Sequence, residues 1–73
     1  PGLFAASRFD PQSGKEILLL FNTSNQPIEQ NVEVAVRSLR FSALAGQCAT
    51  EASAPGSVRV ALPALGFAVC AAE

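Results

Sequence analysis

A run of five consecutive apolar residues, Ile17 to Phe21, is the strongest feature of the hydrophobic pattern. Alternate side chains of an extended strand point to opposite faces, so this run leaves neither face polar. Turn-forming residues bound the run, with Ser13 and Gly14 before it and the segment 22–25, Asn-Thr-Ser-Asn, after it. A helix would need a longer periodic stretch. We therefore predict a central strand over residues 16–22, both faces of which need cover.

Shorter alternating segments predict further strands on either side of this one. The clearest is 57–62, in which Val58, Val60 and Leu62 alternate with Ser, Arg and Ala. The remaining expected strands are 3–9, 28–36, 38–44 and 67–71.

Two of these segments carry specific expectations about the core. In 28–36 the alternation is regular from Asn31 onward, so we expect Val32, Val34 and Val36 to face the core and Glu33 to face solvent. In 38–44 one face is expected to carry Leu39, Phe41 and Ala43.

Clusters of Gly, Pro, Asn and Ser separate the expected strands. In 10–14, Asp comes first, Pro second and Gly last, which is typical of a hairpin loop. The segment 49–56, rich in Ala, Ser, Pro and Gly, is expected to be a surface loop. The pattern as a whole predicts an all-β fold: a small antiparallel β-sandwich or partly open barrel of about six to eight short strands with Greek-key-like connections.

Composition narrows the range of partners. The chain of 73 residues has room for one domain, and its 49% of hydrophobic and 15% of charged residues predict a core with apolar surface left for a neighbour. A net charge of −1, from scattered groups, provides no basic surface for nucleic acid or a membrane. No apolar run approaches the roughly 20 residues of a membrane span. Because the chain begins with Pro1 and Gly2 and contains no Met, we expect it to be a piece of a longer polypeptide.

The two cysteines, Cys48 and Cys70, allow two interpretations. A disulfide would stabilise the fold by about 3 kcal/mol, and small domains with thin cores often need one. The alternative is a pair of buried thiols, because free Cys is among the most buried residue types. We favour the disulfide, which would suit a periplasmic or secreted protein. Without His or a second Cys pair, the two thiols cannot complete a zinc site.

The chain lacks the residues for most catalytic chemistry. It contains no His, so neither a Ser-His-Asp nor a Cys-His arrangement can form, and its glycines are isolated rather than grouped in a phosphate-binding loop. The carboxylates are expected in turns or at solvent-facing strand positions: Asp10, Glu16, Glu29, Glu33, Glu51 and Glu73. We therefore predict no catalytic, cofactor-binding or metal-binding residue in this chain.

Sugar binding and glycosylation are the two remaining candidates for chemistry. Trp and Tyr, which stack best on sugar rings, are absent. The aromatic residues lie in expected strands, where core packing accounts for them better than sugar binding: Phe4, Phe9, Phe21, Phe41 and Phe67. Residues 22–24, Asn-Thr-Ser, match a glycosylation sequon, but a turn position explains Asn22 better.

Several short motifs, taken in order, resemble the C-terminal β domain of the α-amylase family of glycoside hydrolases. The likeness covers nearly the whole chain and rests on the segments 3–9, 14–24, 32–34, 41–46 and 58–69. Leu-Phe-Asn-Thr-Ser at 20–24 stands where the family has a hydrophobic residue followed by Asn, Thr or Phe, and Ser. Leu-Ala-Gly at 44–46 stands at the place of Leu-Gly-Gly, and Leu62-Pro63 opens a closing strand as in the family.

This resemblance implies an accessory domain that packs on an upstream (β/α)₈ catalytic barrel. In the family, Asp and Glu residues of the barrel act on α-glucosidic bonds, and those residues would lie outside this chain. The cysteine pair is not a general mark of the family. An immunoglobulin-like or carbohydrate-binding interaction module is the alternative, although an antibody-type domain would pack a core Trp, and this chain has none.

Overall fold

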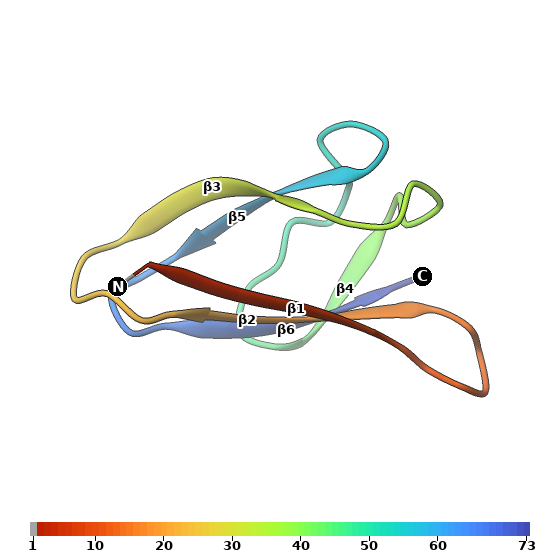
Figure 1. Ribbon diagram of the computed structural model, residues 1–73, viewed down its shortest axis with the longest axis horizontal. Helices are drawn as coiled ribbons and strands as arrows, with labels where there is room; N and C mark the ends of the chain where they lie inside the picture. Colours follow the sequence, from red (N-terminus) through yellow and green to blue (C-terminus); the bar gives the residue numbers. More distant parts are fainter. Residues whose placement is uncertain (1) are drawn as a thin grey trace.

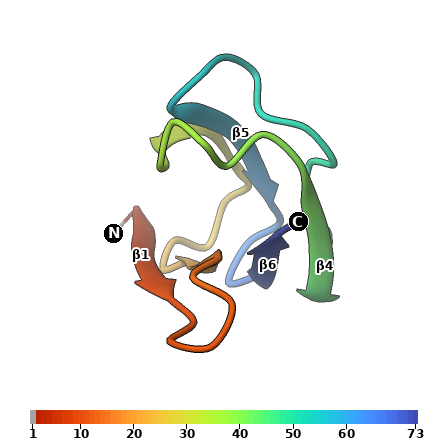
Figure 2. The same ribbon diagram turned by 90° about the vertical axis from the view of Figure 1, so that its right-hand side faces the viewer.

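The structure, a computed structural model, describes residues 2–73, and all of its regular elements in that range are β-strands. In chain order these are β1 (Leu3–Phe9), β2 (Glu16–Asn22), β3 (Ile28–Glu33), β4 (Phe41–Ala45), β5 (Ser57–Leu62) and β6 (Phe67–Ala72) (Figure 1). All the pairings are antiparallel. A larger sheet has the order β1-β2-β6-β4, and a smaller sheet consists of β3 and β5. The two sheets form the two layers of a small sandwich, which confirms the all-β prediction (Figure 2).

β2 is one of the two inner strands of the larger sheet, and its apolar run predicts a strand flanked on both sides. Leu19 lies opposite Ala6 of β1 on one side and Val69 of β6 on the other. The hairpin expected at 10–14 joins β1 to β2, and the Gly14 N–H donates to the Asp10 carbonyl oxygen at 2.7 Å.

The core lies between the two sheets, and most of its buried side chains come from β2, β5 and β6. Leu18 and Leu20 of β2 are buried, together with Val58 and Val60 of β5. The rest of the buried apolar core comprises Val34, Phe41, Leu62, Ala68, Cys70 and Ala72. The alternation predicted for β5 is therefore correct.

The prediction that Val36 faces the core is wrong. β3 ends at Glu33, and Val34 is the last buried residue before the chain turns, with the Ser38 N–H donating to the Ala35 carbonyl oxygen at 2.9 Å. Because the turn ends the strand alternation, the Val36 side chain is 68% exposed.

The strand expected at 38–44 is also shifted. β4 begins only at Phe41, which is buried, whereas Leu39 and Ala43 are exposed. The backbone of the Leu39 region is held instead by the 50–52 segment, through Ala52 N–H to the Leu39 carbonyl oxygen at 2.9 Å. The prediction that Leu39, Phe41 and Ala43 share one face toward the core is therefore correct only for Phe41.

Cys48 and Cys70 form a disulfide, which confirms that prediction. Their Cα atoms are 5.9 Å apart, and the bond ties the segment after β4 to the middle of β6. It fixes the loop that connects the larger sheet to the smaller one.

Candidate functional site

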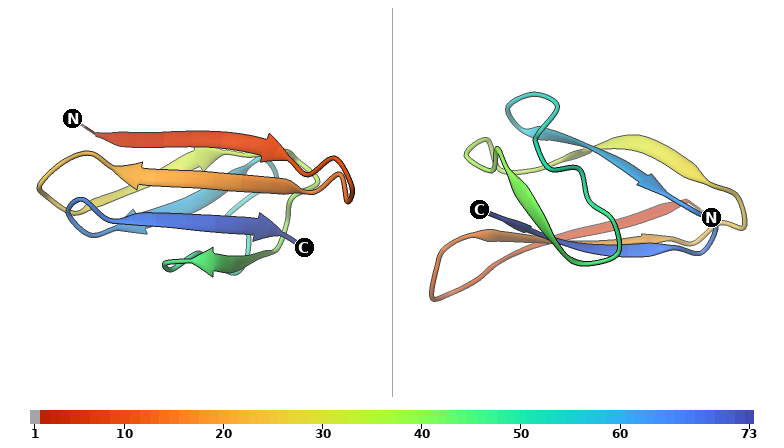
Figure 3. Two further views of the ribbon diagram at one scale, coloured as in Figure 1. Left: turned by 90° about the horizontal axis from the view of Figure 1, so that it is seen from below. Right: turned by 180° about the vertical axis from the view of Figure 1, so that it is seen from behind.

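The larger sheet has one face that no other part of the described chain covers. Figure 3 shows this face from below, with β1, β2 and β6 lying side by side in front of the smaller sheet. We call it the outer face. By strand register it carries Phe4, Ala6, Arg8, Ile17, Leu19, Phe21, Phe67, Val69 and Ala71.

Three phenylalanines form a row across one end of the outer face. Phe4 of β1 pairs with Phe21 of β2, which pairs with Phe67 of β6. Their side chains are 55%, 40% and 58% exposed, respectively. Cross-strand neighbours on one face have Cβ atoms about 5 Å apart, so the three side chains lie next to one another.

The expectation that all the phenylalanines pack in the core is therefore wrong. Only Phe41 is buried, and Phe9 is also half exposed. For the outer-face row the reason is strand alternation: Leu18 and Leu20 occupy the core face of β2, so Phe21 must point the other way. The smaller sheet covers the core face and leaves the opposite face open.

The next two rows continue the apolar character. Ala6, Leu19 and Val69 form the middle row, and Ile17 and Ala71 follow in the third row beside Arg8. An antiparallel sheet with one face in solvent ordinarily alternates apolar and polar side chains. Here Arg8 is the one charged group on the outer face, so the pattern is that of a sheet covered on both sides. Apolar patches of this kind mark interaction surfaces.

Asn22 fixes the end of β2 beside the phenylalanine row. It is completely buried, and its Nδ2 donates to the carbonyl oxygens of Gln26 at 2.7 Å and Pro63 at 2.9 Å. Its Oδ1 accepts from the Ser24 N–H at 2.8 Å. The side chain thus joins the β2–β3 turn to the β5–β6 turn. A glycan on Nδ2 is incompatible with these contacts, so the folded chain does not present the sequon for modification.

Glu16 fixes the opposite end of β2, and its predicted position in solvent is wrong. The side chain is 2% exposed, Oε2 accepts from the Ser7 hydroxyl, and Oε1 accepts from the Ala35 N–H at 3.1 Å. These bonds tie β1 and β2 to the segment after β3, across the gap between the layers. The position of Glu16 at the start of a strand suggested exposure. The prediction failed because the segment that covers Glu16, around Ala35, comes from a distant part of the sequence.

The charged side chains other than Glu16 are dispersed over the surface. Arg59 pairs with Glu29 at 3.2 Å and Arg40 with Glu51 at 3.8 Å, all with exposed side chains, and such pairs contribute little to stability. Within residues 2–73 no three side chains of the types His, Cys, Asp and Glu are grouped to hold a metal ion. No helix capable of crossing a membrane is present in that range.

The apolar pattern of the sequence contained a signal for the outer face. In both β2 and β6 the odd-numbered positions are as apolar as the even-numbered ones, which is the pattern of a strand with two covered faces. The sequence therefore indicated that cover was needed. It did not indicate that the chain itself supplies only one covering layer.

Comparisons of this chain with protein-family models, with curated proteins and with solved structures find no match.

Proposed function

We propose that this chain is a non-catalytic accessory domain that packs on and stabilises an upstream (β/α)₈ barrel of the α-amylase type in the same polypeptide. The outer face is the observation that supports this role best. It presents apolar side chains from three adjacent strands with a single charge, so it suits burial against another apolar surface. The motif resemblance supplies the identity of the partner, a glycoside hydrolase acting on α-glucosidic bonds.

The disulfide is evidence on the cellular compartment of such a protein. A bonded pair persists in oxidising compartments, which supports a periplasmic or secreted parent protein.

The proposal is tested by asking what this domain is attached to. Extract from the source organism is separated on a starch gel, stained for activity, and immunoblotted with antiserum raised against the 73-residue chain. We expect the antiserum to mark a much larger band that also clears starch. A large band without activity on starch or other α-glucosides, or a free small domain, would overturn the proposal.

The phenylalanine row supports a second candidate function, carbohydrate binding. Phe4, Phe21 and Phe67 are exposed neighbours on one face, and aromatic rings stack on the apolar faces of sugar rings. Titration of the isotopically labelled chain with maltoheptaose tests this candidate. Saturable shifts of the amide resonances of these three residues would support sugar binding, and their absence at millimolar sugar would exclude it.

The two candidates differ in what they require of the longer protein. A docking face is hidden in the assembled polypeptide, whereas a sugar-binding face must stay open. A stand-alone immunoglobulin-like module is the remaining alternative, and the immunoblot separates it from both because it predicts no attachment to a glycosidase.

A further inference from the structure

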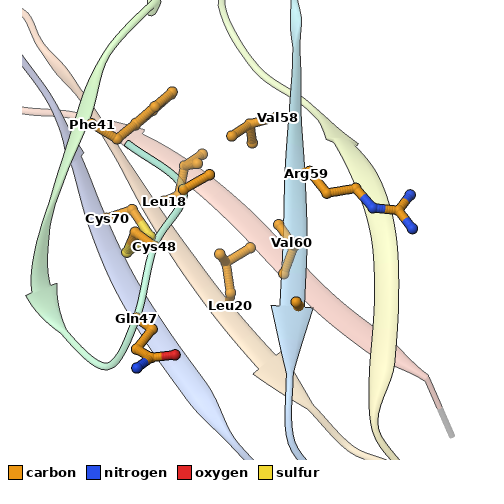
Figure 4. A pocket seen from close by; sticks show the side chains of 11 residues that line it. Leu18, Leu20, Phe41, Gln47, Cys48, Val58, Arg59, Val60 and Cys70 are labelled. Carbon is orange, nitrogen blue, oxygen red and sulfur yellow. A yellow bond between two sulfur atoms is a disulfide. The ribbon is translucent and has the colours of Figure 1, made fainter. Parts of the chain in front are cut away.

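A cavity of about 280 Å³ opens on the side of the sandwich, between β5 and the segment 47–49 (Figure 4). Apolar core side chains line most of it, including Leu18, Leu20 and Val60. An engineered apolar cavity of roughly 150 Å³ already accepts benzene, so this one has room for a large apolar side chain. It lies between the layers and is therefore separate from the outer face.

The disulfide anchors one wall of this cavity. Cys48 is bonded to Cys70 of β6, so the 47–49 segment is held on the side of the larger sheet. Figure 4 shows the two cysteines across the cavity from β5. The segment consequently does not pair with β5, and the one strand pairing of β5 within residues 2–73 is with β3.

The edge of β5 that borders the cavity carries unused backbone groups. The Val34 N–H donates to the Gly56 carbonyl oxygen at 3.0 Å, so the even-numbered residues of β5 bond toward β3. The N–H and C=O groups of Arg59 and Ala61 therefore point toward the open edge. Ser57, in the same phase, bonds to the preceding turn, but the described backbone hydrogen bonds outside the sheets include none from Arg59 or Ala61.

The side chain of Arg59 leaves this edge accessible. Its guanidinium points away from the cavity in Figure 4 and pairs with Glu29 of β3 at 3.2 Å. Ala61 is too small to obstruct the edge. The mouth of the cavity is thus bordered by free peptide groups.

We propose that the open edge of β5 and the adjoining cavity form a strand-addition site for an extended peptide segment that carries one large apolar side chain. An extended backbone offers N–H and C=O groups at the spacing that Arg59 and Ala61 require. Its side chains alternate between two sides, so one of them enters the cavity while its neighbours stay in solvent. A small apolar molecule would fill the cavity but leave the edge groups unbonded. This site does not depend on the proposed function of the outer face.

The test uses the intact, disulfide-bonded chain and the peptide acetyl-Lys-Thr-Phe-Thr-Lys-amide, followed by two-dimensional NMR. We expect saturable shifts of the Arg59 and Ala61 amides and of the Leu20 and Val60 methyl groups. The same peptide with Ala in place of its Phe should bind at least tenfold more weakly, because it leaves the cavity empty.

Two variants separate the contributions of the edge and the cavity. Ala49→Phe fills the cavity, and Ala61→Pro removes an outward N–H at an edge position where Pro is tolerated. Each should weaken binding at least tenfold while the spectrum keeps its folded dispersion. Ala64→Phe, in the exposed β5–β6 turn, adds the same ring elsewhere and should bind like the original chain.

Three results would overturn the proposal. The first is the absence of saturable shifts at millimolar peptide, and the second is shifts confined to the outer face. The third comes from a parallel titration with toluene: shifts of the Leu20 and Val60 methyl resonances with toluene, without any shift of the Arg59 and Ala61 amides with the peptide. That result would make the cavity a site for small apolar molecules.

Discussion

At the scale of single residues, Asn22 has the largest structural role of the polar side chains. Replacing it with Ala leaves the carbonyl oxygens of Gln26 and Pro63 and the Ser24 N–H without their partner. Each unsatisfied buried group costs about 1–3 kcal/mol, so we expect Asn22→Ala to lower the free energy of unfolding by about 3 kcal/mol in urea titrations. Asn25→Ala, at an exposed position of the same turn, should change it by less than about 0.5 kcal/mol. Equal effects of the two substitutions would contradict the role given to Asn22.

Glu16 gives a second prediction at this scale, because it accepts two hydrogen bonds while buried. In Glu16→Gln the amide oxygen can still accept from the Ala35 N–H, and the amide nitrogen can donate to the Ser7 hydroxyl oxygen. We therefore expect a change below about 1 kcal/mol for Gln and a loss of about 2 kcal/mol for Ala, measured by chemical unfolding. A loss for Gln as large as that for Ala would mean that the charge itself is required.

These two residues also show where reading the sequence falls short. The turn position of Asn22 follows from its neighbours, because Asn, Thr and Ser favour turns. Its burial does not, since Pro63 reaches it from a distant part of the chain. The burial of Glu16 is equally hidden from the sequence, because the packing of the two layers brings its hydrogen-bond donor, the Ala35 N–H, to it.

At the scale of elements, the strands with clean patterns were predicted to the residue, and those flanked by irregular loops were not. The bounds of β1, β2 and β5 agree with the predicted ones because turn-forming residues flank each of them. β3 ends earlier than expected, since Gly56 accepts the Val34 N–H and the chain then turns at Ala35 to Ser38. Local alternation alone contains no information on where such a distant contact ends a strand.

The junction between β4 and β6 provides a prediction at the element scale. Gly46 and Gly14 have the same φ of 71°, but a Cβ on Gly46 would collide with the Phe67 carbonyl oxygen, whereas a Cβ on Gly14 meets nothing within 4 Å. Gly14→Ala should therefore cost about 1 kcal/mol, from the left-handed conformation alone. Gly46→Ala adds the steric clash and should cost about 3 kcal/mol, as thermal unfolding of both variants would measure. Similar losses for the two would contradict the close approach of the β4–β5 connection to β6.

At the scale of the whole molecule, the two layers differ in size, with four strands in one and two in the other. The smaller sheet covers the core face of the larger one, and no third layer covers the outer face (Figure 3). The apolar residues on that face, of which Phe4, Phe21 and Phe67 are the largest, contribute to the high hydrophobic fraction of so short a chain. The sequence predicted a strand that needs cover on both faces, and the described residues supply one of the two covers.

Hydroxyl-radical footprinting with mass spectrometry tests the central claim, that the outer face docks on a larger partner in the same polypeptide. The labelling of Phe4, Phe21 and Phe67 would be compared between the isolated chain and the longer polypeptide that carries it. Phe9 is the internal control, because it lies on the opposite side of β1, where its ring faces Arg37 at 5.4 Å. The account predicts labelling of all four residues in the isolated chain and, in the longer polypeptide, at least fivefold protection of the three outer-face residues with Phe9 unchanged. Equal labelling of the three in both contexts would contradict it.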